Sequence, residues 1–167
     1  MHEILHVRMR VLFVCLGNIC RSPTAEAVFR AKVIDRGLAG EIEVDSAGTA
    51  GYHAGDAPDR RAVAEGERRG VSMSGRARQV SGSDLRSFDL VIAMDESNRR
   101  ELLSLATDDE VRGRIQLLRD WDPEAAGHDR AVPDPYYGGD REFAEMFDIV
   151  DRACDGLIAD VQSRLGQ

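Results

Sequence analysis

The sequence predicts a three-layer α/β/α fold, in which a central four-stranded parallel twisted sheet carries helices on both faces. Short apolar segments alternate with longer segments of helical periodicity, the pattern of parallel strands connected by helices. With 167 residues, 43% of them hydrophobic, the chain can build a hydrophobic core of its own. Since no linker rich in Pro, Gly or Ser divides it, we expect one domain over residues 10–167 and a flexible N-terminal extension over residues 1–9.

The first strand and helix follow from local pattern. Residues 10–14 are almost entirely apolar, which is typical of a buried strand. Residues 23–37 carry apolar side chains at helical spacing and end on Gly37, a residue suited to a helix C-terminus. Residues 41–47 alternate apolar and polar side chains and predict a second strand.

The middle of the chain continues this alternation. Residues 48–57 are rich in Gly, Asp and Ala and predict a loop, after which Pro58 is expected to open a helix that ends near residue 69. Residues 88–94 predict a short buried strand and residues 95–105 a helix. Residues 115–118 predict the fourth strand.

The C-terminal part consists of a long loop and a long helix. Residues 119–140 hold two Asp-Pro steps and a Gly-Gly pair, so they predict a loop, and loops of this length in compact domains are usually functional. The following apolar residues recur at spacings of three and four and predict one amphipathic helix: Phe143, Met146, Phe147, Val150, Cys154, Leu157, Ile158 and Val161.

Composition narrows the class of protein. The net charge of −8 argues against a broad surface for nucleic acid or anionic membrane. No segment has the length and apolar character of a membrane span, and residues 1–10 lack the apolar run of a signal peptide. Three cysteines, an odd number, point to a reducing compartment. We therefore expect a cytoplasmic monomer without nucleic-acid or membrane partners.

A loop from Cys15 to Ser22 connects the first strand to the first helix. Gly17 and Asn18 can adopt positive φ, which lets successive backbone N–H groups turn inward to bind an anion. The N-terminus of the helix adds partial positive charge. The guanidinium of Arg21 can bind two phosphoryl oxygens at once. We therefore expect Leu16, Gly17, Asn18, Ile19, Cys20 and Ser22 to form a phosphate-binding loop.

Cys15 is the candidate nucleophile of this loop. The positive surroundings favour its thiolate, which is the reactive form. Ser22 can donate a hydrogen bond to the sulfur and stabilise it as a leaving group. The spacing of Cys15 and Arg21 occurs easily by chance in an arginine-rich chain, but the strand before it and the helix after it make a buried structural cysteine the weaker interpretation.

The sequence resembles the low-molecular-weight protein tyrosine phosphatases, and the resemblance runs from about residue 10 to residue 163. Its motifs are the segments 11–30, 46–49, 77–79, 93–98 and 134–138. It implies hydrolysis of phosphotyrosine in protein substrates through a cysteinyl-phosphate intermediate. Cys15 would be the nucleophile, Arg21 the phosphate clamp and Asp134 the general acid and base, and no metal or other cofactor would be needed.

The resemblance also implies roles around these three residues. Tyr52, Tyr136 and Tyr137 would form an aromatic rim for the phenyl ring of the substrate. Of the two Asp-Pro steps, the resemblance selects Asp134, and Asp122 is expected to be a solvated loop aspartate. His53, beside the rim, is likewise expected to be a solvated loop residue.

Three further positions carry open alternatives. Asp95 would fix Arg21 or the loop, or would simply cap a helix. Cys20 would form a reversible disulfide with Cys15 that protects it from over-oxidation, or would only pack. Many relatives carry a histidine where this chain has Gly75, and that histidine joins the residues matching Asn18 and Ser22 in a hydrogen-bond network. Water or another side chain has to replace it here.

Three other functions are alternatives to phosphotyrosine hydrolysis: two enzymes of the same fold and an inactive binding module. An arsenate reductase needs relay cysteines, and residues 75–100 contain none. A protein arginine phosphatase resembles this chain more closely, but those enzymes have a threonine where this chain has Ile19, whose apolar side chain suits a phenyl ring. An inactive phosphotyrosine-binding module would not require nucleophile, arginine and acid together.

Overall fold

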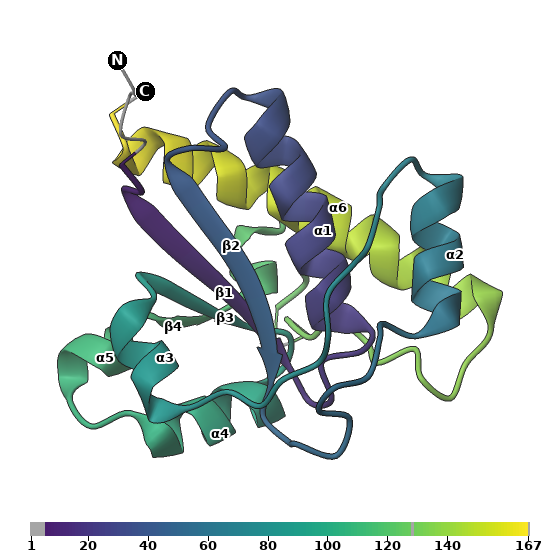
Figure 1. Ribbon diagram of the computed structural model, residues 1–167, viewed down its shortest axis with the longest axis horizontal. Coiled ribbons are helices and arrows are strands. Elements are labelled where there is room, and N and C mark those ends of the chain that lie inside the picture. Colours follow the sequence, from purple (N-terminus) through teal and green to yellow (C-terminus); the bar gives the residue numbers. More distant parts are fainter. Residues whose placement is uncertain (1–5, 128, 167) are drawn as a thin grey trace.

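The computed structural model describes residues 6–127 and 129–166 as a parallel sheet enclosed by helices (Figure 1). The strands are β1 (Met9–Cys15), β2 (Ile42–Gly48), β3 (Leu90–Ala93) and β4 (Ile115–Leu117), and their order in the sheet is β2-β1-β3-β4. The helices are α1 (Arg21–Asp35), α2 (Arg60–Arg68), α3 (Gly82–Ser87), α4 (Glu96–Leu105), α5 (Asp109–Gly113), the 3-10 turn η1 (Leu118–Trp121) and α6 (Asp140–Arg164). All strand pairs are parallel.

Alternate residues of β1 face two separate hydrophobic clusters. Val11 and Phe13 belong to the cluster that α1 and α6 cover, whereas Leu12 and Val14 belong to the cluster formed with α3, α4 and α5. Figure 1 shows α1 and α6 on one side of the sheet and α3, α4 and α5 on the other, with α2 beside α6. The predicted three-layer fold with its four-stranded parallel sheet is therefore confirmed.

The strand order places β1 in the interior of the sheet. Helix α1, which follows β1, covers one face of the sheet, and α3, which precedes β3, covers the other. The carboxyl ends of β1 and β3 lie next to each other, since Val14 pairs with Ala93. Such a switch point leaves a crevice at the carboxyl edge of a parallel sheet, where ligands bind in this class of fold. Cys15 is the last residue of β1 and therefore stands at this crevice.

The main elements are found where the sequence predicts them, with shifts at their ends. Helix α1 begins at Arg21 rather than at residue 23, and Gly37 follows its C-terminus with a φ of 70°. The N–H groups of Gly37 and Leu38 donate to the carbonyls of Ile34 and Val33, the Schellman arrangement that only a residue with positive φ allows easily.

Pro58 does not open α2, contrary to prediction. Asp59 caps this helix by accepting a hydrogen bond from the backbone N–H of Arg61, and α2 begins only at Arg60. Helices α3 and α5 and the turn η1 were not predicted, because four to six residues are too few to show helical periodicity.

The N-terminal boundary of the domain stays a prediction. Residues 1–5 of the expected extension lie outside the described residues. Met9, its last residue, is the first residue of β1, and the backbone N–H groups of Arg8 and Met9 both donate to the carbonyl of Glu41. Within residues 6–127 and 129–166, no helix is both long and apolar enough to cross a membrane.

Asp122 is a buried anchor between η1 and α6, not a solvated loop residue as expected. Its side chain is fully buried and accepts hydrogen bonds from Arg119 at 3.0 Å and from Arg152 at 2.7 and 3.1 Å. The backbone N–H of Glu124 donates to the same carboxylate at 2.9 Å. Burial alone would raise the pKa of Asp122, but these hydrogen bonds outweigh it and lower the pKa to about 2.

We predict that Asp122→Asn destabilises the protein by about 3 kcal/mol at neutral pH, because it leaves Arg119 without its buried counter-ion. The lowered pKa means that the carboxylate stabilises the fold above about pH 4 and that this contribution is lost as the pH falls towards 2. The difference in free energy of unfolding between wild type and variant should therefore shrink over that range, as measured by urea denaturation at each pH.

Asp148→Asn is the matched control for this prediction. Asp148 is 63% exposed and forms a surface ion pair with Arg69, so its loss should cost less than about 1 kcal/mol. Equal effects of the two substitutions would contradict the anchoring role of Asp122.

Candidate active site

The loop between β1 and α1, here called the cysteine loop (residues 15–22), is organised around Asn18. This residue has a φ of 58°, and its backbone N–H points to the sulfur of Cys15 at 3.3 Å. The side-chain amide donates to the hydroxyls of Ser22 at 2.8 Å and Ser46 at 3.0 Å. Its oxygen accepts from the backbone N–H of Arg78 at 3.0 Å. The predicted turn at Asn18 is thus present, and it is tied to two other segments.

The sulfur of Cys15 lies in surroundings that suit an anion. Cys15 is only 3% exposed, and its sulfur lies 3.0 Å from the hydroxyl of Ser22, within hydrogen-bond distance. The N-terminus of α1, with its unpaired N–H groups and partial positive charge, begins at the end of the same loop. A thiolate at this position, or a phosphate group in front of it, would be stabilised by these groups.

Arg21 reaches from the start of α1 to two other elements. Its side chain is 4% exposed and donates to the carboxylate of Asp95 at 2.7 Å and to the carbonyl of Val132 at 3.0 Å. The second oxygen of Asp95 accepts from the backbone N–H of Asn98 and caps α4. The two roles considered for Asp95 are therefore compatible, since each carboxylate oxygen serves one of them.

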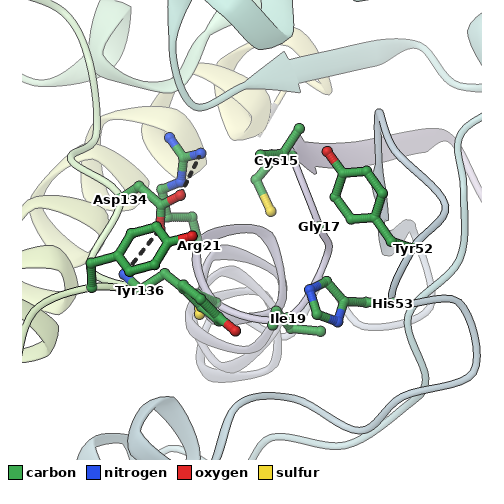
Figure 2. A pocket seen from close by; sticks show the side chains of 11 residues that line it. Cys15, Gly17, Ile19, Arg21, Tyr52, His53, Asp134 and Tyr136 are labelled. Atoms are coloured by element: carbon green, nitrogen blue, oxygen red, sulfur yellow. Dashed lines mark hydrogen bonds and ion pairs between the residues drawn. The ribbon is translucent and has the colours of Figure 1, made fainter.

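Asp134 faces the same arginine from residues 133–139, here called the aspartate loop. One carboxylate oxygen lies 3.6 Å from the guanidinium of Arg21, and the other accepts from the backbone N–H of Tyr136 at 3.1 Å. The side chain of Asp134 is 44% exposed, so it can exchange protons with solvent. Figure 2 shows Asp134 and Arg21 on one side of the pocket, with the sulfur of Cys15 pointing into it.

These residues surround one pocket of about 330 Å³ (Figure 2). It is lined by Cys15, Leu16, Gly17, Ile19, Cys20, Arg21, Tyr52, His53, Asp134, Tyr136 and Tyr137. The structure therefore brings together nearly all the residues singled out in the sequence. Asn18, Ser22 and Asp95 do not line the pocket, but their side chains bond to residues of the cysteine loop from behind.

His53 is part of the pocket wall, contrary to the expectation of a solvated loop residue. Its ring lies 5.9 Å from that of Tyr52 and 6.4 Å from that of Tyr136, and its Nδ1 is 3.2 Å from the carboxylate of Asp56. A Cβ atom at Gly17 would lie only 2.9 Å from the ring of His53. The glycine thus allows His53 to pack onto the cysteine loop. No local sequence pattern predicts this long-range contact.

The three cysteines are free and buried. Burial, followed by the negative charge of nearby Asp59, raises the pKa of Cys20, so this thiol stays protonated at neutral pH. Burial likewise raises the pKa of Cys154, which packs in the core on α6 as its place on the apolar stripe predicts. Cys20 also packs in the hydrophobic core, and its redox role stays a prediction.

Ser46 and Glu26 complete the support of the cysteine loop in a chain that has Gly75. The hydroxyl of Ser46 accepts from Asn18 and donates to the carboxylate of Glu26 at 2.7 Å. Gly75, with a φ of 96°, borders a polar pocket of about 90 Å³ behind this network. Neither Ser46 nor Glu26 was given a role from the sequence, because their contact spans 20 residues and follows no local pattern.

Comparisons with known proteins agree with the fold. The sequence profile of the family described as low molecular weight phosphotyrosine protein phosphatase matches residues 10–166. A low molecular weight protein-tyrosine-phosphatase of Streptomyces coelicolor is 47% identical over 156 residues, which cover 93% of this chain and 95% of that protein.

Solved structures give the same result. The crystal structure of a protein tyrosine phosphatase from Entamoeba histolytica, with Hepes in its active site, superposes with a TM-score of 0.88 at 39% identity and covers 93% of this chain and 97% of that one. A Drosophila arginine phosphatase superposes with a TM-score of 0.84 at 32% identity, over 92% of this chain and 98% of that one. The chain therefore belongs to the low molecular weight phosphotyrosine protein phosphatase family.

Proposed function

We propose that this protein hydrolyses phosphotyrosine in protein substrates through a cysteinyl-phosphate intermediate. Cys15 acts as nucleophile, Arg21 as phosphate clamp and Asp134 as general acid and base. The observation that carries the proposal is the convergence of these three side chains on one pocket at the carboxyl edge of the sheet. A nucleophile, a phosphate ligand and a proton donor are what phosphoryl transfer to a cysteine requires.

In the first step, the phosphoryl group binds against the cysteine loop and the guanidinium of Arg21. The thiolate of Cys15 attacks phosphorus, the sulfur–phosphorus bond forms and the bond to the phenolic oxygen breaks. Asp134, at the mouth of the pocket, gives its proton to the departing oxygen. Arg21 and the backbone N–H groups stabilise the negative charge on the equatorial oxygens, the larger part of catalysis in phosphoryl transfer.

In the second step, the carboxylate of Asp134 takes a proton from a water molecule that attacks the phosphocysteine. The sulfur–phosphorus bond breaks and inorganic phosphate leaves. The hydroxyl of Ser22, 3.0 Å from the sulfur, donates a hydrogen bond that stabilises the departing thiolate. Asn18 holds Ser22 in this position through its side-chain amide.

The pocket walls support an aromatic substrate. Tyr52 is 73% exposed and Tyr136 is 37% exposed, and both line the opening on opposite sides (Figure 2). Ile19 contributes an apolar side chain to the wall. Aromatic rings prefer edge-to-face or offset packing against other rings, so these side chains can hold the phenyl ring of phosphotyrosine above Cys15.

We predict that Cys15→Ser lowers turnover of p-nitrophenyl phosphate by at least about 10³-fold, because a serine hydroxyl is a far weaker nucleophile than a thiolate. Binding of inorganic phosphate, measured by calorimetry, should persist since Arg21 and the loop N–H groups remain. Cys154→Ala is the matched control: it removes a core cysteine of α6, so it should lower the melting temperature but keep activity. Turnover by Cys15→Ser close to that of wild type would contradict the mechanism.

Asp134→Ala should slow the reaction more for a poor leaving group than for a good one. We expect kcat/KM to fall by about 10² or more for phenyl phosphate, whose poor leaving group needs a proton, and much less for p-nitrophenyl phosphate. Asp129→Asn alters an exposed aspartate of the predicted loop 119–140 that lies outside the aspartate loop, so it should leave both values unchanged. An equal loss on the two substrates would show that Asp134 is not the general acid.

The arginine phosphatase alternative is distinguished by substrate. Ile19 offers no hydrogen-bond acceptor to a guanidinium group, and an unpaired polar group at an apolar wall costs free energy. We therefore expect kcat/KM for a phosphotyrosine peptide to exceed that for the matching phosphoarginine peptide by at least about tenfold. A preference for the phosphoarginine peptide would favour the alternative.

A further inference from the structure

The geometry points to Arg61 as a positioning residue that holds the aspartate loop in a fixed position relative to the cysteine loop. The inference rests on the proposed role of Asp134 and concerns how its carboxylate is kept in place. Asp134 lies in a segment without regular secondary structure and is 44% exposed. An acid on such a segment needs a fixed support, because a misplacement of about 1 Å can cost about 10²-fold in rate.

Arg61, in the first turn of α2, contacts the aspartate loop in two ways. Its guanidinium donates to the carbonyl of Gly138 at 3.1 Å and lies over the ring of Tyr136, 5.6 Å from the ring centroid. It also lies over the ring of Phe143, at 4.6 Å, where α6 begins. The arginine therefore fixes both the backbone and a side chain of the loop, and ties them to the following helix.

The contact with Tyr136 leads directly to the carboxylate of Asp134. The backbone N–H of Tyr136 donates to one oxygen of Asp134 at 3.1 Å, while the other oxygen faces Arg21. The N–H of Gly138 donates to the carbonyl of Pro135 at 2.8 Å, which closes the turn that carries both contacts of Arg61. A shift of Tyr136 would thus carry the carboxylate of Asp134 with it.

Arg61 is also linked to the cysteine loop, through Asp59. Asp59 holds Arg61 with two hydrogen bonds, Nε to Oδ1 at 3.0 Å and Nη2 to Oδ2 at 2.9 Å. The backbone N–H of Asp59 donates to the carbonyl of Ile19 at 2.8 Å. The hydrogen bonds from Arg61 are the main cause of the lowered pKa of Asp59, so the pair stays charged across the neutral range.

Asp59 and Arg61 therefore connect the loop that carries the nucleophile with the loop that carries the acid. An ordinary surface ion pair contributes little and links two side chains only. Arg61 instead joins α2, the aspartate loop and the start of α6, and its side chain is 35% exposed. The proposal is that this connection sets the distance from Asp134 to the leaving group.

The test compares leaving groups. We expect Arg61→Ala to raise the ratio of kcat/KM for p-nitrophenyl phosphate over phenyl phosphate by about tenfold, since only phenyl phosphate depends strongly on a well-placed acid. Arg61→Lys keeps a cation near Tyr136 but lacks the fork to Asp59, so it should change the ratio in the same direction but less. If Arg61→Ala does not fold, the ratio measured for Arg61→Lys still tests the proposal. Arg60→Ala, which removes the exposed neighbouring arginine, should leave the ratio unchanged.

The same ratio in the Asp134→Ala background completes a double-mutant cycle. If Arg61 acts through Asp134, then adding Arg61→Ala to Asp134→Ala should not raise the ratio further. An equal loss on both substrates in the single variant, or a full additional rise in the double variant, would overturn the positioning role. A ratio that Asp134→Ala itself leaves unchanged would instead contradict the proposed acid, so the two failures are distinguishable.

Discussion

Asn18 holds a left-handed backbone conformation where the cysteine loop turns, and the geometry around Cys15 depends on it. Such a conformation costs an L-residue about 1–2 kcal/mol, and asparagine tolerates it best among residues with a side chain. Its amide bonds to Ser22 and Ser46, and its oxygen accepts from the N–H of Arg78, so the turn is fixed by α1, β2 and a distant loop at once. The resulting turn directs its backbone N–H at the sulfur of Cys15.

The pocket contains one buried arginine, Arg21, in a protein of net charge −8. Its guanidinium is held by hydrogen bonds to Asp95 and to the carbonyl of Val132. Asp134 lies 3.6 Å from the same guanidinium. In the proposed reaction the phosphoryl group of the substrate binds to the same guanidinium. The phosphate ligand and the acid therefore meet at one arginine.

Much of this could be predicted from sequence because it is local or rests on motifs. The order of strand, cysteine loop and helix follows from the pattern of 20 consecutive residues, 11–30. The family resemblance then predicted the roles of Asp95 and Asp134. The contacts that position them could not be predicted, since Arg61 meets Gly138 across 77 residues and His53 reaches the cysteine loop only through tertiary packing. Asp122 was expected to be solvated because no local pattern reveals that two arginines surround it.

The most direct test of the account is to trap the phosphorylated enzyme. The protein would be mixed with a phosphotyrosine peptide, quenched in acid within milliseconds and digested, and its peptides would be examined by mass spectrometry. The account predicts a peptide heavier by one phosphoryl group, with the modification on Cys15, and its absence from Cys15→Ser. A phosphoryl group on another residue, or hydrolysis at full rate with no phosphoenzyme at any quench time, would contradict the central claim that Cys15 carries the phosphoryl group.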